Sequence, residues 1–482
     1  MGIGWLEPVF DVDRASIVPI YRQIEERLRE QILTGALPGG TRLPPERSLA
    51  GRLGVNRSTV VHAYRELVAD GLIEQRVGSG SRVARLATEA PERSSAEPWW
   101  VTLPRWRVGE FPAVLGELAA VGHGDRIAFV QGVPPADPSP LDDLSKSFAR
   151  VGGNVNYVLT YGESEGYAPL REAIAERMRG RGCSVDAREI LMLTGSTQGI
   201  TLVAQSLAEP GDEIIVEAPT YPGALQIFQI HGLRAIPVAV DDEGLRVDHV
   251  EAILRTRRPR FIYTMPSLHN PTGVTMSDDR RERLLRLAQR AGVPIVEDDP
   301  YGELAATTTV PLVARSNDYV IYLSSFSKTI APSLRLGWMC APRTIYERLL
   351  LRKQSYDMAT SMYVQASVCD YMGTAYDAHV AALRAELNVR RAIAFDAIDK
   401  HWPKSMRVVR SGGGYYVWAT VPRDVRARAL LDAAERRGAS FLFGEPFFAE
   451  HGGDHNIRLA ITPVPRDSIA LGIRRIGEAL HA

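Results

Sequence analysis

The fold of the larger part of this 482-residue chain is decided by one short stretch, Ser324-Ser325-Phe326-Ser327-Lys328-Thr329, and by Arg335, seven residues after the lysine. The stretch directly follows the apolar run 319–323, which has the length of a buried strand. Its hydroxyl groups and the guanidinium can hold a phosphate, and the lysine amine can form an imine with an aldehyde. The stretch therefore predicts a covalently held, phosphorylated cofactor at the end of a strand.

Motifs upstream of the lysine occur in the order that such a cofactor requires. Gly195-Ser196-Thr197-Gln198-Gly199 follows another apolar run and opens a helix, where backbone N–H groups and the helix dipole can bind a phosphate. Tyr221 can stack on a pyridine ring, and Asp298 can keep the ring nitrogen protonated. The cofactor that fits is pyridoxal phosphate (PLP), and the residues expected to bind it are Ser196, Thr197, Gln198, Tyr221, Asn270, Asp298, Tyr301, Ser325, Ser327, Lys328 and Arg335.

From residue 126 onward, apolar runs of strand length alternate with amphipathic stretches of helix length such as 280–291. The runs are 190–193, 213–217, 261–264, 294–297 and 319–323. This alternation predicts an α/β domain with a mostly parallel sheet that helices cover.

The order of these motifs resembles the fold-type I aminotransferases over residues 126–482, and further shared traits are Asn156-Tyr157 to Tyr161-Gly162, Gly166–Arg171 and Asn456–Leu459. The resemblance implies that Lys328 forms the imine and that Asp298 pairs with the pyridine nitrogen, which makes these two the candidate catalytic residues. It implies that Arg458 binds a ligand carboxylate through its two-pronged guanidinium. It also implies that Tyr161 reaches the cofactor phosphate across a dimer interface, and that Gly132 lies in a loop on the ligand side.

The N-terminal part has the pattern of three helices and a hairpin. Apolar residues recur at fourfold spacing in 19–33, which predicts the first helix. A second helix follows Pro44-Pro45, and a third starts near Asn56 or Ser58, either of which can cap it. A strand at 72–77, a glycine turn at 78–80 and a return strand from 81 complete the outline of a winged helix-turn-helix.

Charge and motif both indicate that this part binds double-stranded DNA. Between residues 42 and 85 there are eight arginines against four acids, a modest basic patch. The start of the third helix, with Arg57, Ser58 and Thr59, would enter the major groove, and the wing tip at Gly80 could approach the backbone closely. The segment resembles the GntR family over residues 15–85, through Pro19-Ile20-Tyr21, Gly35, Leu43–Ala50, Leu53–Val60, Gly71-Leu72-Ile73 and Gly78-Ser79-Gly80. This resemblance implies that Arg42, Arg47 and Arg57 contact DNA.

The two parts together resemble the MocR subfamily of GntR regulators. The expected organisation is a DNA-binding domain of α+β type at 12–85, a polar, proline-bounded linker at 86–125, and a PLP-binding domain at 126–482. Trp99, Trp100 and Trp106 could dock the linker on a domain or begin the next core. A homodimer is expected. Residues 267–273 and 297–301 look more like those of working aminotransferases than like many subfamily members, which favours some residual catalysis without establishing turnover.

Composition excludes several other classes of protein. The longest apolar run is too short to span a membrane, and the N-terminus lacks the pattern of a secretory signal. Three widely spaced cysteines, Cys183, Cys340 and Cys369, fit reduced thiols in a cytoplasm and are not spaced as metal ligands. We therefore expect a cytoplasmic protein without a metal site.

Three functions remain open from the sequence. The first is a PLP-dependent transcription regulator that senses an amine, an amino acid or PLP itself. The second is an active aminotransferase with an accessory DNA-binding domain. The third is a repressor whose large domain is only a dimerisation scaffold, and the intact PLP motifs argue against it.

Overall fold

The computed structural model describes residues 10–14, 16, 18–76, 80–84, 126–305, 309–316 and 318–480. The expected linker at 86–125, with its three tryptophans, and the wing residues Gly78 and Ser79 lie outside the described residues. The chain divides into two compact units, an N-terminal one up to Leu103 and a C-terminal one from Pro104. In the described residues, no helix has both the length and the apolar character needed to cross a membrane.

The N-terminal unit is a winged helix-turn-helix. Its elements are α1 (Ile20–Leu33), α2 (Glu46–Leu53), α3 (Arg57–Ala69) and the antiparallel strands β1 (Ile73–Arg76) and β2 (Gly80–Val83). The apolar stripe of α1 is buried together with Val60, Tyr64 and Leu67 of α3, as the spacing predicts. The hydroxyl of Tyr64 donates to the carbonyl of Pro44 at 2.9 Å and thereby holds the start of α2 against α3.

The turn between α2 and α3 depends on two local features. Gly54 ends α2 at φ +62°, in the left-handed region that glycine adopts without strain. The side chain of Asn56 accepts a hydrogen bond from the backbone of Ser58 at 3.2 Å, so Asn56 caps α3. The cap leaves the Ser58 hydroxyl at the exposed start of the helix.

The C-terminal unit contains a large, mostly parallel sheet. In the described residues its strand order is β4 (Ile190–Leu193), β11 (Gly337–Cys340), β10 (Val320–Ser325), β9 (Ile295–Asp298), β8 (Ile262–Thr264), β5 (Glu213–Ala218), β6 (Arg234–Asp241) and β7 (Gly244–Leu245). Strands β10, β9, β8, β5 and β6 run parallel, whereas β11 and β7 are antiparallel to their neighbours. The carboxyl ends of the parallel strands therefore share one edge, where open α/β sheets bind ligands.

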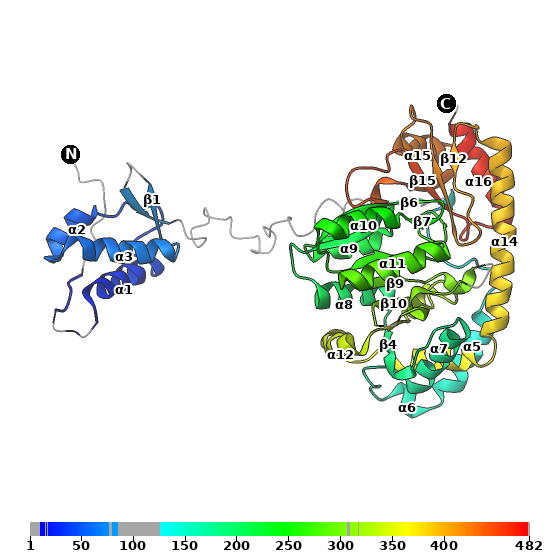
Figure 1. Cartoon of the computed structure of the whole chain (residues 1–482), viewed down its shortest axis with the longest axis horizontal. Helices are drawn as coiled ribbons and strands as arrows, with labels where there is room; N and C mark the ends of the chain where they lie inside the picture. The colour runs from blue at the N-terminus through cyan, green and yellow to red at the C-terminus, as the bar shows by residue number, and fades with distance from the viewer. Residues whose placement is uncertain are drawn as a thin grey trace. The chain divides into compact units, whose positions relative to one another are not determined.

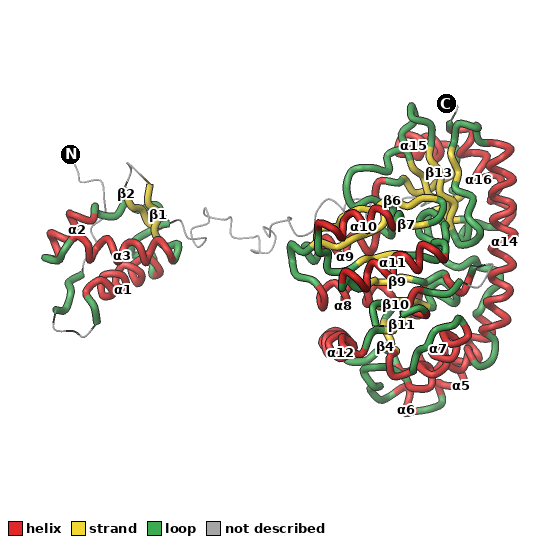
Figure 2. Tube along the Cα trace, in the orientation of Figure 1, coloured by secondary structure: helices red, strands yellow, loops and turns green. Residues whose placement is uncertain are grey.

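Helices cover this sheet and lead to a second, smaller one (Figures 1 and 2). The helices are α5 (Leu141–Gly152), α6 (Val155–Val158), α7 (Ala168–Gly180), α8 (Ser196–Leu207), α9 (Pro222–Ile230), α10 (Val247–Thr256), α11 (Asp278–Ala291), α12 (Arg343–Asp357), α13 (Met362–Met372), α14 (Tyr376–His401), α15 (Ala427–Arg436) and α16 (Arg466–Ala479). The smaller sheet has the order β12 (Arg407–Val408), β13 (Tyr416–Thr420), β15 (Asn456–Ala460), β14 (Ala439–Phe443) and β3 (Ile127–Phe129). The long helix α14 runs beside both regions and packs against α16 (Figure 1).

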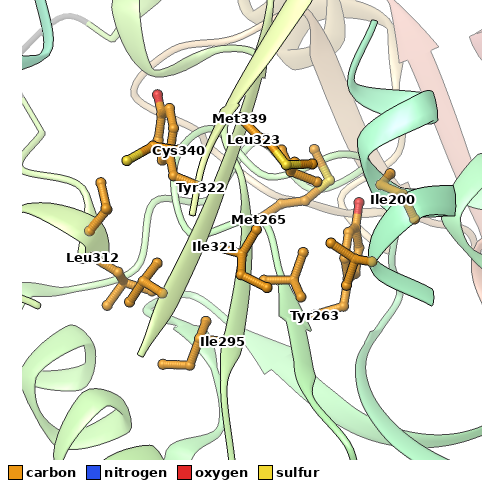
Figure 3. Close-up of a cluster of buried hydrophobic side chains, with 14 of the residues drawn as sticks. Ile200, Tyr263, Met265, Ile295, Leu312, Ile321, Tyr322, Leu323, Met339 and Cys340 are labelled. Carbon is orange, nitrogen blue, oxygen red and sulfur yellow. The ribbon is translucent and has the colours of Figure 1, made fainter. Parts of the chain in front are cut away.

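The core of the large sheet is apolar on both faces. Residues from β8, β10 and β11 meet side chains of α8 and of the loop after β8, as with Tyr263, Leu323 and Met339 near Ile200 and Met265, whereas Ile295 of β9 lies nearer Leu312 (Figure 3). All six residues of β10 are buried, which explains why the run 319–323 lacks the alternation of a half-exposed strand. A rigid central strand thus ends directly at the loop that carries Lys328.

Candidate functional site

A cavity of about 480 Å³ lies at the carboxyl edge of the large sheet. It collects side chains from the ends of β8, β9 and β10, from the start of α8, and from β13 and β15 of the small sheet. The residues that line it are Gln131, Gly132, Gly195, Ser196, Thr197, Tyr221, Met265, Asn270, Asp298, Pro300, Tyr301, Ser325, Ser327, Lys328, Pro332, Arg335, Tyr416 and Arg458. Eleven of the predicted cofactor and ligand residues beside Lys328 are thus brought together, namely Gly132, Ser196, Thr197, Tyr221, Asn270, Asp298, Tyr301, Ser325, Ser327, Arg335 and Arg458.

One end of the cavity has the donors that a phosphate needs. Gly195 precedes α8 with φ +123°, and a Cβ on it would lie 3.0 Å from Nη2 of Arg335, so only glycine fits this cradle. The hydroxyl of Ser325 donates to Ser327 at 2.9 Å and accepts from the backbone N–H of Ser327 at 3.1 Å, which fixes the loop before Lys328. A helix N-terminus, several hydroxyls and one guanidinium together fit the phosphate of PLP.

The middle of the cavity fits a protonated pyridine ring. Asp298 ends β9 and is only 2% exposed. Its Oδ2 accepts a hydrogen bond from the hydroxyl of Tyr263 at 2.7 Å, whereas its buried Oδ1 has no hydrogen-bond partner among the described residues. Burial raises the pKa of this carboxyl to about 7, against the hydrogen bond from Tyr263, which lowers it. A pyridinium N–H would give Oδ1 its missing donor and would favour the ionised carboxylate.

This burial predicts a pH-dependent stability of the apoprotein. The folded-state pKa of Asp298 lies above its ordinary value of 3.8. The contribution of its protonated carboxyl to the free energy of unfolding is therefore complete below about pH 4 and is lost as pH rises towards 7. We expect wild-type apoprotein to lose roughly 2–3 kcal/mol more unfolding free energy between pH 5 and pH 7.5 than Asp298→Asn does. Urea unfolding of both apoproteins at the two pH values measures the difference. Parallel pH dependences of the two proteins would contradict a raised pKa at Asp298.

Lys328 is held from both sides at the centre of the cavity. Its Nζ donates to the carbonyl of Gly132 at 2.7 Å. The hydroxyl of Tyr415 donates to the carbonyl of Lys328, and Nε2 of the buried His379 on α14 lies 2.8 Å from the carbonyl of Thr329. A carbonyl only accepts, so Nε2 carries the hydrogen of that bond. These contacts fix the lysine's backbone from the small sheet and from α14.

Arg458 projects into the cavity from β15. Its Nη1 donates to the side-chain oxygen of Asn270 at 3.2 Å, and its Nη2 donates to the carbonyl of Val130 at 2.6 Å. The guanidinium carbon lies 4.3 Å from the ring centre of Tyr416 and 5.1 Å from that of Phe447. Burial lowers the pKa of Arg458, and the neighbouring tyrosines oppose that shift. Because it carries an anion-binding fork into a largely buried space, Arg458 is suited to hold a carboxylate.

Tyr416, which the sequence did not single out, also lines the cavity, and its ring lies against the guanidinium of Arg458. Its hydroxyl lies 2.7 Å from the hydroxyl of Tyr301, and a Cβ on Gly132 would come within 2.0 Å of it. Tyr416 and Gly132 are far apart in the chain, and so are Tyr263 and Asp298, so only the register of the two sheets reveals these pairs. The local signal for Tyr416 was no more than an aromatic pair after three glycines.

Two predicted cofactor residues do not line the cavity. The side chain of Gln198 turns back, accepting from the backbone N–H of Thr194 at 2.9 Å and donating to Asp357 at 3.0 Å. Its own backbone N–H donates to the carbonyl of Gly195, so Gln198 supports the start of α8 instead of facing the cavity. Tyr161 is 86% exposed and lies outside the cavity of its own chain.

In the N-terminal unit, the predicted DNA-binding residues lie in α2, at the start of α3 and at the base of the wing. Arg57 is the first residue of α3 and is exposed, with its Nη2 4.0 Å from Oε2 of Glu46. Arg47 and Ser58 are also exposed, and Thr59 is half-buried. Arg42 pairs with Arg82 in an isolated bridge beside β2, and its guanidinium lies near Gly80. The start of α3 and the base of the wing thus each carry an arginine.

The position of Arg57 predicts a loss of specific DNA binding on its removal. Arg57→Ala should weaken operator binding by about 1–3 kcal/mol, because one base contact is lost, and should leave the cofactor spectrum unchanged. Titration of labelled operator at fixed salt measures this loss. Arg27→Ala is a matched control, since Arg27 is exposed on α1 and pairs with Glu30. If the Arg57 variant bound the operator with wild-type affinity, Arg57 would not be one of the residues that contact the bases.

Comparison with known proteins agrees with both units. The family model for bacterial regulatory proteins of the gntR family matches residues 20–83, and the model for aminotransferases of class I and II matches residues 136–447. The HTH-type transcriptional regulator YdfD of Bacillus subtilis is 31% identical over 95% of this chain and 96% of its own length. The probable rhizopine catabolism regulatory protein MocR of Rhizobium meliloti is 30% identical over 89% of this chain and 87% of its own.

The C-terminal unit is also similar to solved aminotransferases. LysN, the α-aminoadipate aminotransferase of Thermus thermophilus, matches with a TM-score of 0.70 and 32% identity over 77% of this chain and 98% of that one. That structure holds N-(5′-phosphopyridoxyl)-L-leucine, and PLP is the cofactor of this fold. The two matched units and the relatives that span both lead to one conclusion: the chain belongs to the MocR subfamily of GntR-type transcription regulators, in which a DNA-binding winged helix-turn-helix is joined to a PLP-dependent, fold-type I aminotransferase-like domain.

Proposed function

We propose that this transcription regulator responds to a small amine that carries a carboxylate, and that the PLP site of the C-terminal unit senses it. One observation carries the proposal: Lys328, Asp298 and Arg458 line the same cavity. An amine-exchanging lysine, a ring-nitrogen partner and a carboxylate clamp are the three groups that recognition of an amino acid on PLP requires.

The side chains divide the work of binding between them. When bound, PLP supplies an aldehyde that bonds an amine and a pyridinium ring that withdraws electrons. Asp298 would hold the proton on the ring nitrogen through Oδ1, and Tyr301 and Asn270, which line the same cavity, would bind the ring oxygen. Arg458 orients the ligand by its carboxylate, while the rings of Tyr416 and Phe447 exclude water from one face of the guanidinium.

We further propose that the protein works as a homodimer. Leu159 and Tyr161 are 78% and 86% exposed, and Leu351, Tyr356 and Met358 are also largely exposed. Large exposed apolar side chains favour contact with another protein surface. In a second copy this contact would bring Tyr161 to the partner's cofactor phosphate, which would account for its absence from the cavity of its own chain.

The effect on DNA follows from population shift. An effector changes operator binding only to the extent that it binds two states of the protein with different affinity. A ligand would alter the hydrogen bonds of Lys328 and Arg458. These bonds hold the carbonyls of Gly132 and Val130, which directly follow β3. A DNA-binding regulator of the gntR family acts where the DNA is, and this supports a cytoplasmic location.

A second function, aminotransferase activity, is favoured by a specific observation. The C-terminal unit is 32% identical to LysN, and Asn270, Asp298 and Tyr301 all line the cavity beside Lys328. The third alternative is a scaffold without cofactor. It would not explain why Oδ1 of Asp298 is buried without a hydrogen-bond partner or why Gly195 leaves space beside Arg335.

One experiment separates these functions. An operator is first selected from random DNA with the purified full chain. A panel of amino acids and simple amines is then titrated while the cofactor spectrum and operator affinity are recorded in the same samples. We expect one class of ligand to change both signals together. A spectral change that proceeds to the amino form of the cofactor, with release of a keto acid and no change in operator affinity, would favour the enzyme. A colourless protein would favour the scaffold.

A further inference from the structure

We propose that the segment Val130–Gly132 senses whether the effector is bound, because it accepts hydrogen bonds from the two side chains that the effector engages. The proposal rests on the function proposed above and adds how the binding of a ligand changes the chain outside the cavity. The hydrogen bonds that carry it join described residues only.

The two contacts come from opposite sides of the cavity. Nζ of Lys328, in the loop after β10, donates to the carbonyl of Gly132 at 2.7 Å. Nη2 of Arg458, on β15, donates to the carbonyl of Val130 at 2.6 Å. Carbonyls two residues apart are therefore held by one group from the large sheet and one from the small sheet.

The segment has little freedom to replace these donors. Phe129 and Val130 are buried, and the Cα of Gly132 lies so near the hydroxyl of Tyr416 that a methyl group there would overlap it. A carbonyl that loses its donor in such a place cannot simply turn to another protein group. Loss or gain of either bond should therefore change how tightly the whole segment is held.

The lysine contact depends on what Lys328 is bonded to. If Nζ were bonded to the cofactor's aldehyde carbon, it would carry at most one hydrogen and would be drawn towards that carbon, so it would give up the bond to Gly132. On exchange, the effector nitrogen bonds that carbon, the bond from the carbon to Nζ breaks, and the two hydrogens of the effector amine pass to Nζ. Lys328 is then an amine again and can hold Gly132. The contact thus forms when the effector binds.

The position of the segment in the chain gives this contact a consequence. It directly follows β3, a three-residue strand at the edge of the small sheet, which pairs with β14 from Ile127↔Ala439 to Phe129↔Phe441. Residues 85–125, which join the two units, precede β3. A short edge strand has few hydrogen bonds to its neighbour, so a change at its end can alter how stably it is paired. The hydrogen bond of Lys328 can therefore affect β3 and, through it, the preceding residues that lead to the DNA-binding unit.

Hydrogen exchange of the full chain tests the proposal. The probe is N-(5′-phosphopyridoxyl)-L-alanine, which fills the site without bonding Lys328. With the probe bound, peptides covering 127–134 should exchange roughly tenfold faster in Lys328→Met than in wild type, because the methionine keeps the stem but lacks the donor. Peptides of β14 should be unchanged. In wild type, the same segment should exchange faster with PLP alone, when Lys328 is engaged, than with the probe.

Matched controls keep the result decisive. Lys400→Ala removes an exposed lysine that pairs with Asp396, and should behave as wild type. If 127–134 exchanged equally fast in wild type and in Lys328→Met, with the probe bound to both, the sensing role of Val130–Gly132 would be overturned. The proposed function as a PLP-dependent regulator would not be affected. If calorimetry showed that wild type does not bind the probe, both the sensing role of Val130–Gly132 and the proposed function would be overturned. Faster exchange throughout the C-terminal unit of Lys328→Met would also overturn the sensing role, since the effect would then not belong to this segment.

Discussion

Lys328→Ala should abolish the visible absorbance of covalently bound PLP while the protein remains folded. The reason is that only Lys328, of the five lysines in the chain, lies in the cavity with Asp298 and Arg335. Lys146 and Lys400 are exposed in surface ion pairs, and Lys353 is buried against Asp357 at 2.8 Å. Absorbance spectra of the purified variant, with circular dichroism to verify folding, measure the loss.

A direct mapping experiment checks the same assignment. Borohydride reduction of the wild-type protein, followed by peptide mass analysis, should place the phosphopyridoxyl group on the peptide that contains Lys328. Lys400→Ala should retain the wild-type spectrum. Reduction of the cofactor onto any of the other four lysines would show that the site is assigned wrongly.

Arg458→Gln should raise the concentration of amino acid needed for the spectral shift by roughly tenfold or more, because a charge-assisted bond worth about 1.5–3 kcal/mol is lost. The chemistry at the aldehyde needs only an amine, so the carboxylate contact must come from the protein. The spectrum of the variant without ligand should stay that of bound PLP. Spectral titrations of both proteins with the same amino acids measure the change.

Ligands without a carboxylate supply the control for Arg458. A simple amine should titrate almost equally in wild type and variant, since it makes no use of the guanidinium. Equal weakening of both ligand types would indicate that the cavity itself is disturbed, because Arg458 also donates hydrogen bonds to Asn270 and Val130. An unchanged amino-acid titration would mean that another residue binds the carboxylate.

The loop after β8 illustrates how far local motifs reach. Asn270, Asp298 and Ser325 could each be placed at the end of an apolar run, and runs that form parallel strands end at one edge of the sheet. These three residues do line one cavity. The helices and strands of both units are confirmed for the same reason: burial on one face imposes a period of 3.6 or 2 on the sequence, and glycine, proline and asparagine mark the ends.

Gln198 shows where a motif alone misleads. Its place in Gly195–Gly199 makes it a neighbour of the phosphate in sequence, yet on a helix successive side chains point in different directions. Its amide turns to Thr194 and Asp357, and Asp357 is brought there by the packing of α12 on α8. The outcome depends on a partner 159 residues away in the chain, which no spacing rule contains.

The sequence by itself therefore determined the kind of protein: two domains, their folds, the cofactor, and the family to which the chain belongs. These depend on local periodicity and on residue types that a given chemistry requires, and both can be read along the chain. The tertiary structure alone decided the contacts between distant elements, such as Tyr263 with Asp298, Tyr416 with Tyr301, and Lys328 and Arg458 with the carbonyls of 130–132. Sheet order and register set those contacts, and they result from the packing of many side chains at once, so that no single stretch of sequence encodes them.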